Sequence, residues 1–178
     1  MATIRVWDPF VRAFHWSLAP SFAVAWLSGE GPERLHTLAG YAAGALVLAR
    51  VAWGFLRTGY ARFSEFVRSP AAVVDYLKSV AAGSERRFVG HNPAGGAMIV
   101  ALLTSLAATA ATGWMLTTDA FWGSILLQRA HSVLAHGVLL LALAHLCGVA
   151  LASLRHRENL VRAMVIGDKR APEPGDVA

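Results

Sequence analysis

Four long apolar stretches constrain this chain more than any other feature of its sequence. They run over residues 10–27, 35–56, 94–116 and 130–154 and make up about half of the 178 residues. Each is about long enough, at roughly 1.5 Å per residue, for a helix to cross a bilayer core of roughly 30 Å. The third and fourth stretches contain no Asp, Glu, Lys or Arg. No alternating strand pattern is present, so the sequence predicts an all-α fold, a four-helix transmembrane bundle.

Composition supports a membrane protein and excludes several other classes. Only 15% of the residues are charged and 56% are hydrophobic, whereas an ordinary soluble domain has roughly 25% charged residues. The single cysteine, Cys147, excludes a disulfide framework, a cluster held by several thiolates and the covalent attachment motif of c-type haem.

Lys and Arg are distributed unevenly around the four stretches. Thirteen of the 16 lie at or before the start of the first stretch, between the second and third, or after the fourth. The two opposite loops carry only Arg34 and Arg129. The positive-inside rule therefore places both termini and the long middle loop in the cytoplasm of a multi-pass membrane protein. The net charge of +5 then faces anionic lipid headgroups, and no nucleic-acid partner is expected. A cleaved signal peptide is the alternative for the first stretch.

The remaining segments are short. Ser69-Pro70 is a helix start and Gly83 a helix stop, and a second helical segment is expected over 157–166, so both segments are predicted to lie on the cytoplasmic membrane surface. Residues 1–166 are predicted to form one domain. Residues 167–178 are predicted to be a disordered cytoplasmic tail, because they combine Pro, Gly and charged residues.

Histidines supply the chemistry that the apolar stretches otherwise lack. His131 and His145 are 14 residues apart in the fourth stretch, so on a helix they share a face about 21 Å apart along the axis, whereas His136 points elsewhere. The predicted topology places His131 level with His36 on the outer side and His145 toward the level of His15 on the inner side. Paired imidazoles on facing helices are the axial ligands of six-coordinate b-type haem, so two haems are predicted. Neutral imidazoles that hydrogen-bond between helices are the alternative.

Two arginines are candidates for the haem propionates. Arg50 lies deep in the second stretch, 14 residues after His36 and on nearly the same face, and we expect it to bind a propionate of the inner haem. Arg12 is a second candidate for that haem, although snorkelling to lipid headgroups explains it equally well. An iron with two histidine ligands has no open position for substrate, so its task is one-electron transfer.

These residues resemble a known family, the bacterial cytochrome b561 and nickel-hydrogenase b-type cytochromes. The resemblance extends from about Val6 to Arg162 and rests on the motifs Val6-Trp7-Asp8-Pro9, Phe14-His15-Trp16, Leu35-His36, Gly40-Tyr41 and Gly90-His91-Asn92-Pro93-Ala94-Gly95, with His131 and His145. It implies an integral membrane cytochrome with two non-covalent b haems whose iron ligands are His15, His36, His131 and His145. His91 belongs to the loop part of this signature and is interpreted as a loop or propionate contact. His136, outside the signature, is interpreted as a packing or hydrogen-bonding residue, with a proton path to quinone as the alternative.

The function expected from this sequence is electron transfer in a respiratory chain. Electrons would pass between the quinone pool, ubiquinone or menaquinone, and a periplasmic c-type cytochrome or a dehydrogenase or hydrogenase subunit. One branch of the family oxidises superoxide and reduces quinone, which is an alternative for this chain. A cofactor-free structural or transport module is the alternative from another class. The sequence is also compatible with a homodimer.

Overall fold

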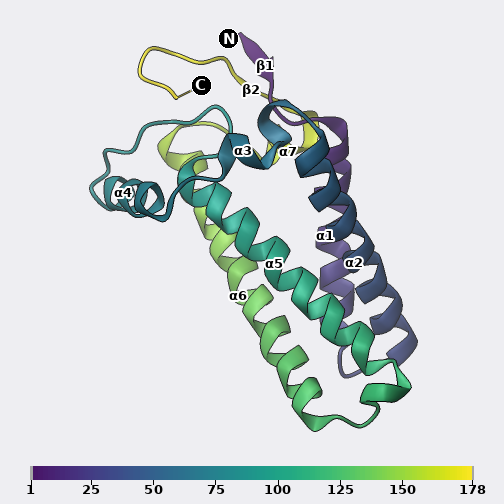
Figure 1. Cartoon of the computed structure of the whole chain (residues 1–178). Coiled ribbons are helices and arrows are strands. Elements are labelled where there is room, and N and C mark those ends of the chain that lie inside the picture. The colour runs from purple at the N-terminus through teal and green to yellow at the C-terminus, as the bar shows by residue number, and fades with distance from the viewer. Residues whose placement is uncertain (1, 178) are drawn as a thin grey trace. The chain divides into compact units, whose positions relative to one another are not determined.

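The computed structural model describes residues 2–177 and is all-helical in character, with seven α-helices and 72% of the residues in helices of any type. The chain divides into two compact units, each of which is described by itself. The first unit comprises the residues up to Arg12 together with 53–100 and 143–178, and the second comprises 13–52 and 101–142. The four long helices contribute to both units (Figure 1).

The four apolar stretches form helices close to the predicted bounds. These are α1 (Pro9–Leu27), α2 (Glu33–Leu56), α5 (Pro93–Leu116) and α6 (Ile125–Arg155). Among the described residues, α2, α5 and α6 are long and apolar enough to cross a membrane. Helix α1 is shorter, with 19 residues, and Arg12, His15 and Pro20 lower its mean hydropathy. The crossing of the membrane by α1 therefore stays a prediction.

A polar residue followed by proline starts three of the helices. The side chain of Asp8 accepts a hydrogen bond from the Val11 amide, and that of Asn92 accepts one from the Gly95 amide. The Ser69 hydroxyl does the same for α4 (Pro70–Ala81). Proline fits the first helical position because the amide hydrogen it lacks would have no partner there. The predicted helix after Ser69 is confirmed, and so is a helix near the C-terminus, α7 (Leu160–Ile166).

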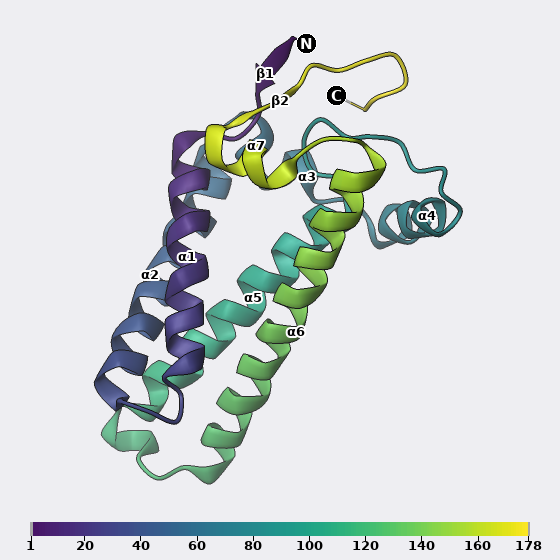
Figure 2. The same ribbon diagram turned by 180° about the vertical axis from the view of Figure 1, so that it is seen from behind.

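The first unit joins the two ends of the chain through a small sheet. Strand β1 (Thr3–Arg5) pairs antiparallel with β2 (Asp168–Arg170), with Ile4 opposite Lys169, and the two strands lie side by side in both views (Figures 1 and 2). Phe66 and Val89 are the most deeply buried apolar side chains of this unit. The one-turn helices η1 (Gly59–Ala61) and α3 (Phe63–Phe66) cover this core.

The sheet corrects the prediction of a disordered tail over residues 167–178 for its described residues, 167–177, because residues 168–170 form β2; residue 178 lies outside the described residues. The Arg87 side chain is only 4% exposed and binds three acceptors: the carboxylates of Glu158 and Asp176, and the carbonyl of Arg170. The Lys169 ammonium, equally buried, donates to the carbonyls of Phe88 and Val89. A tail that looks solvated by its composition is therefore ordered by long-range ion pairs.

Those ion pairs also shift the titration of the Glu158 carboxylate. Burial alone would raise its pKa, but hydrogen bonds from Arg87 and the charge of Lys169 outweigh burial and lower the pKa. The Arg87 guanidinium responds in the opposite direction. Burial opposes its charged form, yet its bonds to the two carboxylates raise its pKa. We refer to Arg87, Glu158, Lys169 and Asp176 as the ionic cluster.

The second unit contains the remaining parts of the long helices and the one-turn helix η2 (Asp119–Phe121). Its buried apolar side chains are few and come from all four helices: Phe14, Ala43, Val47, Leu103, Leu106 and Val138. Large apolar side chains point outward instead, for example Leu126, Val133 and Leu140 of α6. Such a surface is stable only where lipid rather than water surrounds it.

Candidate haem site

Two of the predicted iron ligands lie side by side in the second unit. His36 is in the first turns of α2 and His131 is in the first third of α6. Their ring centroids are 6.0 Å apart and the ring planes are 79° apart. The two helices, far apart along the chain, thus place two imidazoles opposite each other at one level of the unit.

The Nδ1 atom of each ring has a backbone partner. His36 Nδ1 lies 2.8 Å from the carbonyl oxygen of Ala25 in α1. His131 Nδ1 lies 3.0 Å from the carbonyl oxygen of Thr109 and 3.1 Å from the Thr112 hydroxyl, both in α5. A carbonyl can only accept, so it favours the tautomer in which Nδ1 carries the proton and Nε2 keeps its lone pair. This is the usual arrangement of a histidine that binds a metal through Nε2.

A glycine on α5 makes room for His131. A Cβ atom at Gly113 would lie 3.0 Å from Cε1 and 3.4 Å from Nδ1 of the His131 ring. A larger residue at this position would press on the imidazole, which would have to shift by a few tenths of an ångström. Gly113 is therefore a positioning residue for His131.

The separation of the two rings fits a shared metal. Two imidazoles that bind one ion from opposite sides, each through a nitrogen at about 2 Å, have ring centroids about 6 Å apart. The observed 6.0 Å agrees with this value. A pair of neutral Nε2 donors is the ligand set that b-type haem requires, so the residues present fit the group.

The other predicted site residues are placed as follows. His15 belongs to the second unit and His145 to the first, so their pairing stays a prediction. Arg50 is buried, with 2% of its surface exposed, in the second unit. Arg12 belongs to the first unit, where its guanidinium donates to the carbonyl of Val165 at 2.6 Å. The contact of Arg12 with a propionate of the inner haem stays a prediction.

The remaining two histidines discussed above have aromatic neighbours. His136 makes an edge contact with Trp26, at 4.9 Å between centroids, and its Nδ1 bonds to the Ser132 carbonyl of its own helix. His91, in the first unit, lies between Trp7 and Phe66, at 4.5 Å and 4.7 Å. Both contacts are typical of packing residues.

These features define a class: a helical membrane protein with paired imidazoles suited to metal ligation. Comparison with known families identifies the family within this class, because the model of the prokaryotic cytochrome b561 family matches residues 6–167. The chain belongs to the prokaryotic cytochrome b561 family. It is accordingly a membrane b-type cytochrome of electron transfer, and the family implies binding of b-type haem. No curated protein and no solved structure matches the chain.

Sequence reasoning identified the two imidazoles but missed what holds them. The acceptors of the two Nδ1 atoms are main-chain carbonyls, which every residue has, so no residue type marks them. Gly113 is one of 16 glycines, and only the approach of α5 to His131 distinguishes it. The Thr112 hydroxyl was the one available signal, since a polar residue in an apolar helix usually has an interhelical partner.

Proposed function

We propose that this chain is a dihaem cytochrome b of the bacterial inner membrane. One haem lies between His36 and His131 and the other between His15 and His145. Electrons pass across or along the membrane between the quinone pool and a redox partner at the outer surface, a c-type cytochrome or a dehydrogenase or hydrogenase subunit. The observation that carries the proposal is the pair His36 and His131, with rings 6.0 Å apart and each Nδ1 bonded to a carbonyl.

The protein's part in this function is to hold and orient. Haem with two histidine ligands supplies one-electron transfer. Ala25 and Thr109 fix the protonation of the two imidazoles through their carbonyls, which makes each ring a stronger ligand. Arg50 is assigned to a propionate of the inner haem, because it lies 14 residues after His36 and on nearly the same face of α2, about 21 Å further along the axis. Arg12 is assigned to the same haem.

The distribution of charge supports the orientation. Both termini and the loop between α2 and α5 are assigned to the cytoplasm, since 13 of the 16 Lys and Arg residues lie in them or at the adjoining ends of α1 and α6. Helix α1 is the fourth span in this topology. The pair His36 and His131 then belongs to the outer haem, and the pair His15 and His145 to the inner one.

The test is haem stoichiometry in purified variants, measured by the pyridine haemochrome spectrum against protein concentration. The native chain should carry about two haems, and His131→Ala about one. His136→Ala is the matched control, since it removes an imidazole from the same helix whose Nδ1 bonds within that helix, and it should keep both haems. A colourless native protein would refute the cytochrome assignment and favour the cofactor-free module. Loss of a haem in His136→Ala but not in His131→Ala would overturn the ligand assignment.

Oxidation of superoxide is a second candidate, favoured by the position of Arg34. This exposed cation lies in the first turn of α2, two residues before His36, where it attracts small anions to the outer haem. Arg129 is the other cation of the outer loops. Haem reduction by a superoxide source, compared with reduction by quinol and by a reduced c-type cytochrome, separates the two functions. Arg34→Gln should slow only the superoxide reaction.

A further inference from the structure

Two threonines on neighbouring turns of α5 meet the imidazole of His131 in different ways. Thr109 presents its main-chain carbonyl, 3.0 Å from Nδ1, and Thr112 presents its side-chain hydroxyl, 3.1 Å from the same atom. The Thr109 carbonyl lies next to Gly113, since a helical carbonyl accepts from the amide four residues further on. Gly113 has no Cβ that would keep the ring away from this carbonyl. One ring nitrogen therefore has two oxygen partners on α5.

The Thr112 hydroxyl accepts from His131 and does not donate to it. Its own proton has an acceptor within α5, because Oγ1 lies 2.9 Å from the carbonyl of Ala108 and 2.9 Å from that of Thr109. The Thr109 carbonyl can only accept, so Nδ1 of His131 carries a proton. That proton is shared between the Thr109 carbonyl and the Thr112 oxygen.

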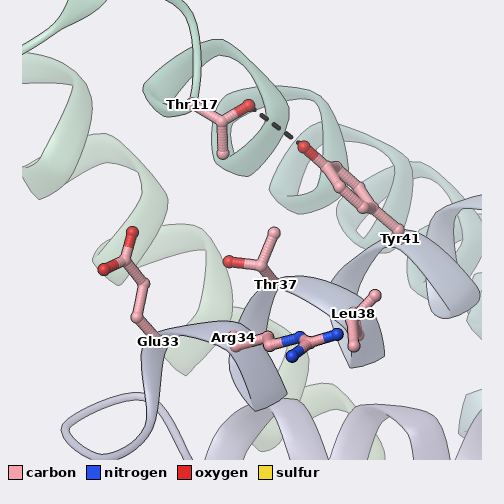
Figure 3. Close-up of a pocket in the computed structure, with 6 residues that line it drawn as sticks. All are labelled: Glu33, Arg34, Thr37, Leu38, Tyr41 and Thr117. Atoms are coloured by element: carbon pink, nitrogen blue, oxygen red, sulfur yellow. Dashed lines mark hydrogen bonds between the residues drawn. The ribbon is translucent and has the colours of Figure 1, made fainter.

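Two other threonine hydroxyls of α5 show the same internal donation. The Thr109 hydroxyl donates to the Ser105 carbonyl at 2.8 Å. The Thr117 hydroxyl donates within α5 as well, and its oxygen lies 3.0 Å from the Tyr41 hydroxyl of α2, which is then the donor (Figure 3). Thr112 and Thr117 thus each present a side-chain oxygen to a donor on another helix. Thr109, in contrast, holds His131 with a main-chain oxygen.

The two imidazoles of the pair are held unequally. His36 Nδ1 bonds to the carbonyl of Ala25 at 2.8 Å, whereas the proton on His131 Nδ1 is shared between two oxygens. An acceptor for the Nδ1 proton makes an imidazole a stronger electron donor at Nε2. A stronger donor favours the more positive oxidation state of a bound metal, so hydrogen bonds of this kind shift its reduction potential.

We infer that Thr112 is a positioning residue whose hydroxyl lowers the reduction potential of the outer haem through the His131 ring. The inference rests on the proposed function, which puts this haem between His36 and His131. It adds a residue that binds no iron and acts on one ligand of the pair. One hydrogen bond of usual strength changes an equilibrium about threefold to tenfold, which sets the size of the effect.

The test is redox potentiometry of the purified protein, followed at the absorption band of the reduced haem. Thr112→Val keeps the shape of the side chain without the hydroxyl, and Thr112→Ser keeps the hydroxyl without the methyl group. At the midpoint potential of the native outer haem, Thr112→Val should raise the ratio of reduced to oxidised haem about threefold to tenfold. A tenfold ratio corresponds to about 59 mV for one electron. Thr112→Ser should keep the native potential.

Two more variants complete the series. Thr109→Val is the matched control, because its carbonyl stays in place and only the hydroxyl that bonds to Ser105 is lost, so its potential should stay native. Thr112→Ala lacks the hydroxyl without adding bulk to α5, and its potential should shift in the same direction as that of Thr112→Val. The couple that disappears in His131→Ala identifies the outer haem in each titration.

A role in packing alone would give the opposite pattern. If the methyl group of Thr112 were what matters, Thr112→Ser would shift the potential and Thr112→Val would not, and that result would overturn the inference. A native potential in Thr112→Val, an equal shift in Thr109→Val, or a shift confined to the other haem would overturn it as well. Haem per chain is measured in every sample. A native chain without haem would refute the proposed function, whereas bound haem with an unchanged potential in Thr112→Val would refute only the role of Thr112.

Discussion

Replacing Arg87 by methionine is the sharpest test of how the first unit is held together. The Arg87 side chain is 4% exposed, and it bonds to Glu158 at 2.8 Å and 3.2 Å, to Asp176, and to the Arg170 carbonyl at 2.8 Å. Methionine fills much of the same volume but offers no donor. Two carboxylates whose side chains are 9% and 11% exposed would lose their common cation.

The expected cost follows from that burial. Removing one partner of a buried ion pair costs about 3 to 5 kcal/mol. Lys169, whose Nζ lies 3.5 Å from the second oxygen of Glu158, offsets part of that cost at Glu158. Arg5→Met supplies the comparison within the same unit. Arg5 pairs with Asp168 of β2 at 2.9 Å, but its side chain is 61% exposed, so its loss should cost about 0 to 1 kcal/mol. Both arginines hold the C-terminal segment, but Arg87 is buried and binds three acceptors, whereas Arg5 is exposed and is paired with Asp168.

Amide hydrogen exchange measures the difference. The Arg170 amide bonds to a Glu158 oxygen, and the Val177 amide bonds to the Arg87 carbonyl, so both report opening of the C-terminal segment. In Arg87→Met their exchange should accelerate roughly 10²- to 10³-fold, since each 1.4 kcal/mol is about a factor of ten. In Arg5→Met it should accelerate less than about fivefold. Equal acceleration in the two variants would refute the argument from burial, and slow exchange throughout α5 would show that the long helices remain folded.

Three further predictions concern pH and two glycines. Because the folded-state pKa of Glu158 is lowered, its stabilisation is complete above its ordinary value of about 4.3 and is lost as the pH falls through the lowered pKa; the protection factors of the β2 amides, which are corrected for the intrinsic exchange rate at each pH, should therefore stay high at neutral pH and fall in acid, and protection that falls on raising the pH would contradict the sign. Gly113→Ala should lower occupancy of the outer haem, measured as haem per chain, since its Cβ would press on His131; unchanged occupancy would exclude the positioning role. Gly167→Ala should lower the melting temperature, at a cost of about 1 to 3 kcal/mol, because Gly167 has φ +95° and a Cβ there would lie 2.9 Å from the Trp7 carbonyl; an unaltered melting curve would show that the turn relaxes freely.

Local signals predicted the helices well. The bounds of α4 follow from Ser69 and Gly83 at its two ends. Helix α6 starts five residues before the predicted apolar stretch, because Gln128 and Arg129 are polar but are good helix formers. The hydropathy of the sequence predicts where contact with lipid ends. The helix itself extends further, to the last residue whose backbone hydrogen bonds are helical.

The spacing of histidines predicted a contact that lies far away in sequence. His36 and His131 are brought together because both are near the start of a helix that runs in the same direction through the membrane in the predicted topology. For a membrane protein the sequence predicts the depth of each residue in the bilayer, and so it predicts which residues of different helices lie at the same level. The sequence of a soluble protein gives no such information. The carbonyls of Ala25 and Thr109 could not be predicted in this way, because they depend on the rotation of α1 and α5 about their own axes.

The ionic cluster changes what the excess of Lys and Arg on the predicted cytoplasmic side means. Arg87 and Lys169 were both counted as headgroup-facing cations, yet each is 5% exposed and neutralised by Glu158 or Asp176. They therefore cannot contribute attraction to anionic lipid in the folded protein. Arg87 and Lys169 still count toward the predicted orientation, because the positive-inside rule acts on the chain as it is inserted into the membrane, before these ion pairs exist. Arg87 can thus serve twice, first as part of the charge distribution that sets the predicted topology and then, paired with acidic residues 71 and 89 positions away along the chain, to fold its segment.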